Sequence, residues 1–229
     1  MNVTIYHELE QGTDEWLAAR CGILTASTIG QLITPKTVKV ASNEVSRGFT
    51  ATLVAERITG YVEPVIPTRD MERGTLDEPY ARDAYRERTG ADVAEVGFMV
   101  REFNGHRLGY SPDGLVWEDG LIEIKSRRQK KHLATILADE VPLENMAQIQ
   151  TGLLVSGRAW CDYVSYCGGM PLYIKRVLPD PRWVTAINDA LTKFEDDAAQ
   201  MIAAYNNMVG GHPVTERIDH DDYTVKEIF

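Results

Sequence analysis

The sequence predicts an α/β (α+β) fold in which helices flank a central mixed β-sheet. Segments with helical periodicity dominate residues 13–90, and short extended segments separated by turn residues follow over 92–125. A helix, two further extended segments and a last helix complete the chain, an order typical of a mixed sheet covered by helices. With 229 residues, 44% of them hydrophobic and 25% charged, the chain resembles one globular domain in size and composition. Residues 1–229 are therefore predicted to form a single domain.

Helices are expected first, over 13–22, 25–33, 43–59 and 76–89. Thr13, Thr25 and Asn43 are good N-cap residues, and a glycine follows three of these segments. The residues 34–39 between the second and third helices are expected to form a loop. Pro79 is compatible with the fourth helix only if it lies in the first turn.

The extended segments that follow are expected to form short strands and hairpins. They are separated by strong turn sequences, Asn104-Gly105, Pro112-Asp113-Gly114 and Glu118-Asp119-Gly120. After them we expect a helix over 142–156, strands over 159–167 and 172–178, and a last helix over 181–207. The polar tail from Gly210 is expected to be loosely held.

The charge and the cysteines exclude several classes of protein. Lys and Arg number 24 against 34 Asp and Glu, and the formal net charge of −10 argues against a protein that coats polyanions without specificity. Three cysteines without a C-x-x-C pair argue against a disulfide framework or a four-cysteine metal or iron–sulfur site. The start of the chain lacks the pattern of a signal peptide, and no apolar run is long enough to cross a bilayer. A cytoplasmic protein without a membrane partner is expected.

The segment 111–125 reads SPDGLVWEDGLIEIK and places charged residues within a predicted strand. Because side chains alternate between the faces of a strand, Ile122 and Ile124 share one face while Glu123 and Lys125 share the other. Closure of the hairpin can bring Asp113 beside Glu123. Two neighbouring carboxylates repel each other and call for a cation.

Hard oxygen ligands of this kind suit Mg²⁺ or Mn²⁺ better than zinc. The backbone carbonyl of Ile124 is a natural third ligand, and Lys125 could orient the attacking water and stabilise charge on a phosphate oxygen. The alternative is a surface hairpin with an Asp turn and a weak Glu–Lys pair. These residues alone leave the two interpretations open.

The pattern Pro112-Asp113…Glu123-Ile124-Lys125 resembles the PD-(D/E)xK nuclease motif. Over a longer stretch, the chain resembles the bacteriophage lambda-type exonucleases, also called alkaline or YqaJ-like viral recombinase exonucleases. The further segments that carry this resemblance are Trp16-Leu17-Ala18-Ala19-Arg20 with Leu24-Thr25-Ala26-Ser27, Arg73-Gly74-Thr75-Leu76-Asp77-Glu78, Met146-Ala147-Gln148-Ile149-Gln150 and Ala159-Trp160. Their order along roughly residues 11–180 is more specific than any single motif.

The resemblance implies a restriction-endonuclease-like core and a two-metal 5′→3′ exonuclease. Such an enzyme digests one strand of linear duplex DNA to mononucleotides and leaves a 3′ single strand. It implies two Mg²⁺ ions, which Mn²⁺ can replace. The residues matching the catalytic and metal-binding positions are Asp113, Glu123, Ile124 (through its carbonyl), Lys125, Glu78 and Gln148. Many relatives in the broader group carry Q-x-x-x-Y, but Gly152 stands at the tyrosine position here, so Gln148 is given a supporting role.

Arg20, Ser27 and Ser111 match a pocket for the 5′-phosphate. Arginine is suited to bidentate phosphate contacts, and Ser27 lies just inside an expected helix N-terminus, which favours anions. The alternatives are a surface arginine and a helix-capping serine. Ordinary alternatives also exist for Glu78, a first-turn acid, and Gln148, a polar boundary residue.

The densest basic segment follows the predicted catalytic strand. It supplies Arg127, Arg128, Lys130 and Lys131 as candidate phosphate contacts, with a solvated charged loop as the alternative. Lys36 is a weaker candidate in the 34–39 loop. Met71 falls where the family places an apolar wedge between bases, although simple packing also explains it.

The resemblance further implies a ring-shaped homotrimer around DNA and a partner that anneals single strands. It places the protein in the cytoplasm of a bacterial host, encoded by a phage or prophage. Two other functions stay open at this point. One is a site-specific or structure-specific endonuclease with the same chemistry, for which a 5′-phosphate pocket would be useless. The other is an inert DNA-binding module, which would be expected to have lost one of the motif side chains.

Overall fold

The computed structural model describes residues 3–218 and is mixed α/β, as predicted. The helices are α1 (Asp14–Arg20), α2 (Glu44–Thr59), α3 (Arg69–Thr89), α4 (Gln129–Ala138), α5 (Leu143–Ser156) and α6 (Pro181–Val209), with a 3₁₀ turn η1 (Ile29–Gln31). The strands are β1 (Val3–Tyr6), β2 (Leu24–Thr25), β3 (Ile33–Thr34), β4 (Lys39–Val40), β5 (Val93–Ala94), β6 (Phe98–Phe103), β7 (His106–Tyr110), β8 (Gly114–Val116), β9 (Gly120–Ser126), β10 (Trp160–Tyr166) and β11 (Tyr173–Val177).

The central sheet is mixed and has the strand order β11-β10-β9-β8-β5. β10 is parallel to β9, and the connection between them carries α4 and α5, whereas the remaining neighbours are antiparallel. A second sheet has the order β1-β6-β7-β2, and β3 and β4 form a small hairpin. The strands expected from the sequence are therefore present, but they divide between two main sheets.

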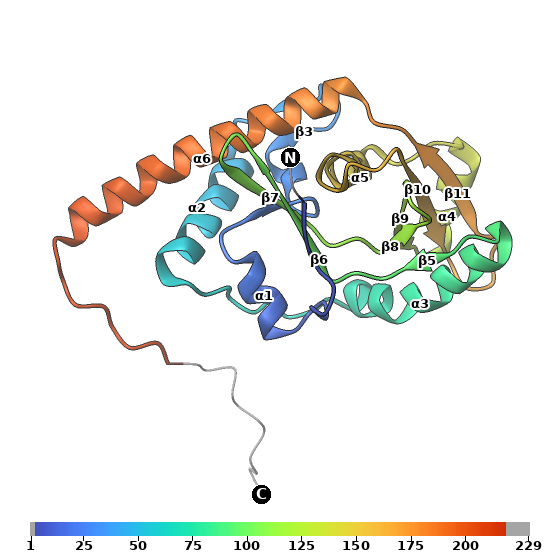
Figure 1. Cartoon of the computed structure of the whole chain (residues 1–229), viewed down its shortest axis with the longest axis horizontal. Helices are drawn as coiled ribbons and strands as arrows, with labels where there is room; N and C mark the ends of the chain where they lie inside the picture. The colour runs from blue at the N-terminus through green and yellow to red at the C-terminus, as the bar shows by residue number, and fades with distance from the viewer. Residues whose placement is uncertain (1–2, 219–229) are drawn as a thin grey trace, which may run out of the picture.

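Helices cover both faces of the central sheet (Figure 1). On one face, Ile122 and Ile124 of β9 form a core cluster with Ala81 and Tyr85 of α3. On the other face, α5 and α6 contribute to a larger cluster that includes Leu121 of β9. The alternation of side chains predicted for β9 is thus confirmed, and the face that carries Glu123 looks toward α5.

One expected helix is wrong. Residues 25–33 form the end of β2, the η1 turn and the start of β3 instead of a helix. Thr25 pairs with Gly109 of β7, and the Ala26 amide donates to the Gly109 carbonyl at 2.8 Å. Pairing with a distant strand has outweighed the local N-cap signal, and the expected 34–39 loop forms the turn of the β3–β4 hairpin.

The structure also differs from the sequence prediction at α3 and α4. α3 begins at Arg69, with Thr68 as its N-cap, so that Pro79 lies in the helix interior rather than in the first turn. The proline ring cannot donate one helical hydrogen bond, but the remaining turns and the buried Ala81 and Tyr85 hold the helix. α4 was not expected, because its first turn is basic.

α2 and α6 pack together at the end of the molecule away from the central sheet (Figure 1). Arg57 of α2 makes a bidentate pair with Glu195 of α6, with both N–O distances at 2.7 Å. Within residues 3–218, no helix is long and apolar enough to cross a membrane. Part of the tail from Gly210, predicted to be loosely held, lies outside the described residues.

Candidate active site

The β8–β9 hairpin brings the predicted acids together. Gly114 pairs with Ile122, so the residues just before and after this pair, Asp113 and Glu123, lie opposite each other. The Asp113 carboxylate accepts a hydrogen bond of 2.6 Å from the Ile124 amide, which fixes it against β9. The turn at Gly120 needs glycine, because a Cβ there would lie 2.2 Å from the Trp160 ring.

Lys125 and Gln148 complete this side of the cluster. The Lys125 ammonium lies 2.6 Å from Oε1 of Glu123 and donates to Oε1 of Gln148 on α5 at 3.1 Å. Gln148 therefore holds the lysine rather than standing alone at the boundary. This contact agrees with the supporting position given to Gln148 from the sequence.

Glu78 reaches the cluster from α3 through Arg82, which the sequence analysis did not single out. Arg82 makes an ion pair with Glu78, donates to the backbone carbonyl of Asp113 at 3.1 Å and lies 2.8 Å from the Glu95 carboxylate. Its side chain is almost fully buried. An arginine four residues after an acid on a predicted helix was the signal that could have indicated this pair.

Burial and mutual repulsion govern the pKa values of the acids. Burial raises the pKa of Glu123 to about 7, with the nearby Asp113 charge adding to the rise and Lys125 opposing it. Burial and the Asp113 charge likewise raise the pKa of Glu78 to about 7, and burial raises the pKa of Asp113. Burial alone would lower the pKa of Lys125, but the charges of Glu123 and Asp113 outweigh it and raise that pKa.

The donor set fits a hard divalent cation. Glu123 is fully buried; its Oε2 has no hydrogen-bond partner among the described residues, and its Oε1 forms an ion pair with the Lys125 ammonium at 2.6 Å. Two carboxylates and a carbonyl are ligands that Mg²⁺ prefers. No group of three or more His, Cys, Asp or Glu side chains in residues 3–218 is already arranged as a metal site. The candidate set does not need a third acid, because Asp113 and Glu123 would be joined by the carbonyl of Ile124.

The predicted phosphate pocket also assembles. Arg20 lies over the Trp16 ring at 3.8 Å and donates to the hydroxyls of Thr25 and Ser27, both at 3.3 Å. The Trp16 indole donates to the Ser111 hydroxyl at 3.0 Å. Ser111 lies two residues before Asp113, so the pocket adjoins the acids. Burial lowers the pKa of Arg20 to about 10, which leaves it cationic near neutral pH.

Two details of this pocket differ from the sequence prediction. Ser27 does not lie inside a helix N-terminus, because the expected helix is absent; it sits in the turn between β2 and η1. Trp16 and Thr25 contact Arg20 directly but were not assigned to the pocket. Trp16 stands four residues before Arg20 on α1, a spacing that places both side chains on one helical face and could have indicated their contact.

The basic segment lines a groove of about 620 Å³ beside Lys125. Its lining residues include Met71, Arg73, Ser126, Arg127, Arg128, Lys130 and Lys131. Several of these cations have partners: Arg128 pairs with Asp70 at 2.8 Å, Arg127 donates to Asn145 at 2.7 Å, and Lys131 pairs with Glu144. Arg127 and Arg128 lie in the connection after β9, and Lys130 and Lys131 lie in the first turn of α4; contact with phosphates stays a prediction. Met71 is 52% exposed at the groove rather than packed in the core.

Lys36 does not line this groove; it lies exposed in the β3–β4 turn.

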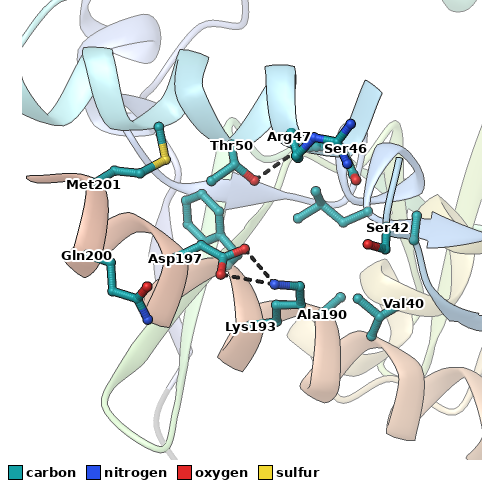
Figure 2. Close-up of a pocket in the computed structure, with 13 residues that line it drawn as sticks. Val40, Ser42, Ser46, Arg47, Thr50, Ala190, Lys193, Asp197, Gln200 and Met201 are labelled. Carbon is teal, nitrogen blue, oxygen red and sulfur yellow. Dashed lines mark hydrogen bonds and ion pairs between the residues drawn. The ribbon is translucent and has the colours of Figure 1, made fainter. Parts of the chain in front are cut away.

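A separate cavity of about 400 Å³ lies between α2 and α6 (Figure 2). Polar groups that line it are paired with one another: Lys193 contacts Asp197 at 2.8 Å, and Thr50 donates to the Ser46 carbonyl at 3.0 Å. We therefore place the candidate active site at the acidic cluster and not in this cavity.

Comparison with known proteins identifies the family. The model of the YqaJ-like viral recombinase domain matches residues 15–159. The chain belongs to this family. The resemblance drawn from the sequence is thereby confirmed, and the matched range contains both the acidic cluster and the phosphate pocket.

Solved structures agree with this family assignment. An alkaline exonuclease (LHK-Exo) from Laribacter hongkongensis is 33% identical, covers 86% of this chain and 98% of its own, and superimposes with a TM-score of 0.76. The same values hold for LHK-Exo in complex with dAMP. A phage related exonuclease from Haemophilus somnus 129PT, 12% identical over 80% of this chain and 96% of its own, shares the fold with a TM-score of 0.62. Among functionally curated proteins, none matches the chain.

In this YqaJ-like chain, Gly152 stands where the broader group carries the tyrosine of Q-x-x-x-Y, and a different tyrosine lies beside it. The ring of Tyr110, from the end of β7, lies against the α5 backbone at Gly152, one turn after Gln148. The glycine therefore makes room for an aromatic ring that comes from a strand. Tyr110 was not singled out in the sequence, because a tyrosine that ends a strand has the pattern of a core residue.

Proposed function

We propose that the protein is a Mg²⁺-dependent 5′→3′ exonuclease. It would degrade one strand of linear double-stranded DNA from 5′-phosphorylated ends to mononucleotides. The proposal is supported by the family, by the 33% identity to an alkaline exonuclease and by that enzyme's complex with dAMP. The observation that carries it is the junction of two groups of residues: the Arg20 pocket and the Asp113–Glu123 cluster share the segment 111–113.

Each residue has a separate task in the proposed reaction. Asp113, Glu123 and the Ile124 carbonyl would hold two Mg²⁺ ions, or Mn²⁺ in their place, with Glu78 nearby. The ions, when bound, neutralise phosphate charge and lower the pKa of water. Lys125, held by Gln148, would orient the attacking water and stabilise charge on the scissile phosphate.

Binding of the DNA end would involve the two basic regions. Arg20, with Ser27 and Ser111, would hold the terminal 5′-phosphate, since guanidinium and hydroxyl groups donate to phosphate oxygens. The groove beside Lys125 would neutralise backbone phosphates through Arg127, Arg128, Lys130 and Lys131, and Met71 would contact bases. Lys36 would take part only if the DNA extended to the β3–β4 turn.

The family resemblance adds the expected partners. We infer a ring-shaped homotrimer that encloses DNA and a single-strand annealing protein that receives the 3′ strand for recombination. The chain would act in the cytoplasm of a bacterial host, encoded by a phage or prophage. The formal net charge of −10 suits an acidic outer surface around a basic channel.

Digestion of end-labelled linear duplex DNA, with and without Mg²⁺, tests the reaction and its polarity. The substrates carry either 5′-phosphate or 5′-hydroxyl, covalently closed circles are included, and the Lys125→Ala protein is the control. Mg²⁺-dependent loss of the 5′-ended strand, with intact circles and an inactive control, is expected. Cut circles would indicate an endonuclease, and no digestion by folded protein would indicate a binding module.

The Arg20→Ala protein tests the phosphate pocket in the same assay. It should digest 5′-phosphate and 5′-hydroxyl ends at similar rates, because the group that recognises the phosphate is gone. A preserved preference for 5′-phosphate would remove Arg20 from the pocket. Arg88→Ala is a matched control, since Arg88 is an exposed arginine near the C-terminus of α3.

A further inference from the structure

Tyr110 carries a buried hydroxyl that the reaction described above does not use. Its side chain is 1% exposed, and its hydroxyl has no hydrogen-bond partner among the described residues. A buried hydroxyl without a partner costs about 1–3 kcal/mol relative to a satisfied one. Phenylalanine would fill the same space without that cost, so the hydroxyl calls for an explanation.

The opposite helix is adapted to this ring. A Cβ at Gly152 would lie 2.7 Å from Cζ of Tyr110, the carbon that bears the hydroxyl. Gly152 lies inside α5, where glycine destabilises a helix by about 1 kcal/mol relative to alanine. The chain thus has a poor helix former at the one place where a better one would displace the hydroxyl end of Tyr110.

The Tyr110 ring lies against Gly152, and Gln148, one turn earlier on α5, contacts Lys125, the ion-pair partner of Glu123. Tyr110 therefore lies beside the buried acids, and the charges of Glu123 and Asp113 add to the rise in its pKa that burial causes. In the same buried cluster, Oε2 of Glu123 has no partner among the described residues, while Oε1 is paired with Lys125. A hydroxyl donor without a partner and a carboxylate with one free oxygen are chemically complementary. Burial raises the pKa of Tyr110 well above its usual value, so the hydroxyl keeps its proton.

We propose that Tyr110 is a positioning residue for Glu123. With a divalent cation bound at Glu123, the Tyr110 hydroxyl would donate a hydrogen bond to the Glu123 carboxylate. This bond fixes the direction of the carboxylate, as outer hydrogen bonds do for other metal ligands. The inference rests on the proposed function in one respect, namely that Glu123 binds the cation.

Tyr163 provides a matched control. It is also fully buried with an unpartnered hydroxyl, and it pairs with Glu123 in the β9–β10 register. Tyr163→Phe therefore removes the same kind of group at a similar depth without removing the proposed donor.

The test measures Mn²⁺ binding by calorimetry to wild type, Tyr110→Phe and Tyr163→Phe, together with their melting temperatures and digestion of linear duplex DNA. Tyr110→Phe is expected to weaken Mn²⁺ binding about 10-fold, within the 10–100-fold range of outer-shell changes, and to lower digestion without lowering the melting temperature. Tyr163→Phe should bind Mn²⁺ as wild type does. In a Glu123→Gln background, Tyr110→Phe should have no further effect on Mn²⁺ binding.

The outcomes separate this inference from the proposed function. A wild-type protein that binds Mn²⁺ and digests DNA, with Tyr110→Phe unchanged, overturns the role of Tyr110 alone. Equal losses in Tyr110→Phe and Tyr163→Phe also overturn it, because the effect would then be a general one of the buried hydroxyls. A folded wild-type protein that neither binds Mn²⁺ nor digests DNA overturns the proposed function and this inference with it.

Discussion

At the scale of single residues, the burial of Glu123 lowers the free energy of unfolding when its carboxyl group ionises. It is a fully buried carboxyl group with a pKa of about 7, against 4.5 for an unperturbed glutamate. Its protonated form is therefore favoured in the folded state. The stabilisation from this proton is complete below pH 4.5 and is lost as the pH rises through 7. For one such buried group, the loss in the free energy of unfolding is on the order of 3 kcal/mol.

The metal-free protein should accordingly melt at a lower temperature at pH 8 than at pH 5.5. Glu123→Gln should reduce this fall and exceed wild type in melting temperature at pH 8, while digesting no DNA. Part of the fall should persist, because Glu78 also has a pKa of about 7. Calorimetric melting across this pH range checks the prediction, with the exposed Glu87→Gln as control. A Glu123→Gln protein that melts lower than wild type at pH 8 would contradict it.

Lys125 is expected to separate catalysis from metal binding. Lys125→Ala removes the ammonium beside Glu123 but keeps Asp113, Glu123 and the Ile124 carbonyl. Digestion should fall by at least about 100-fold, the lower range for one proton-transfer or charge-stabilising group. Mn²⁺ should still bind, as calorimetry would show. Loss of Mn²⁺ binding in a folded Lys125→Ala protein, with the partly exposed Lys175→Ala control unaffected, would argue against this division of roles.

At this scale, the site residues that could be predicted from the sequence are those that one hairpin brings together. The alternation along β9 and the turn at Asp113 were enough to place Asp113, Glu123 and Lys125 together. The resemblance supplied Arg20, Ser27, Ser111, Glu78 and Gln148, and the structure brings these residues to the same region. The spacing of four residues could have indicated the ion pair of Arg82 with Glu78, but not its contact with Asp113. Tyr110 could not be predicted, because its importance depends on a contact between β7 and α5 that no local pattern encodes.

At the scale of elements, substitution by alanine is expected to have opposite effects at two of the helical glycines, Gly152 and Gly48. Neither has a positive φ, so alanine is allowed by the backbone at both. A Cβ at Gly48 of α2 would meet nothing within 4 Å, whereas one at Gly152 of α5 would lie 2.7 Å from the Tyr110 ring. Gly48→Ala should raise the free energy of unfolding by about 0.5–1 kcal/mol through helix propensity.

Gly152→Ala should lower the free energy of unfolding by about 1–3 kcal/mol, because overpacking outweighs the gain in propensity. Urea denaturation of both variants compares them directly. Equal stabilisation of the two proteins would show that the Tyr110 ring can move aside without cost. That result would also weaken the case that Gly152 is there for Tyr110.

Elements with strong local signals were predicted well, and those fixed by distant contacts were not. Helices α2 and α5 begin and end within about one residue of their expected bounds, because Asn43 caps the start of α2, Pro142 precedes α5 and a glycine follows each helix. The expected helix over 25–33 is absent because β2 finds a partner in β7. α3 was predicted seven residues short, since Gly74 and Pro79 are poor helix formers that the tertiary structure tolerates.

At the scale of the whole molecule, an acidic protein carries a local basic groove. The formal net charge is −10, yet Arg127, Arg128, Lys130 and Lys131 line one groove beside the candidate site. Neutralising phosphates releases counterions, so binding to duplex DNA should weaken linearly in a plot of log K against log salt. The slope reflects how many phosphates the protein neutralises.

Replacing Lys130 and Lys131 by alanine should reduce that slope by about 0.9 for each phosphate that the variant no longer neutralises. Fluorescence anisotropy with a 5′-phosphorylated duplex, measured in Ca²⁺ to limit cleavage, gives the slope for wild type and variant. Lys193→Ala on α6 is the control, since Lys193 pairs with Asp197 away from the groove. An unchanged slope in the double variant would place the DNA elsewhere on the surface.

The fold class was within reach of the sequence, but the three-dimensional division of the sheet was not. The order of helices and strands predicted a mixed α/β protein. Which strands share a sheet depends on pairings such as β1 with β6 and β2 with β7, between residues about 95 and 84 positions apart. The single domain 1–229 and the proposed ring stay predictions.

The pairing of Gly114 with Ile122 has a consequence for how this family can change over time. The residues between Asp113 and Glu123 form the two arms and the tip of one hairpin. Adding or removing one residue within an arm of β9 would turn Glu123 toward α3 and Ile122 toward α5, because neighbouring side chains point in opposite directions. Inherited length variation between the two acids should therefore be confined to the tip at 117–119 or occur in steps of two.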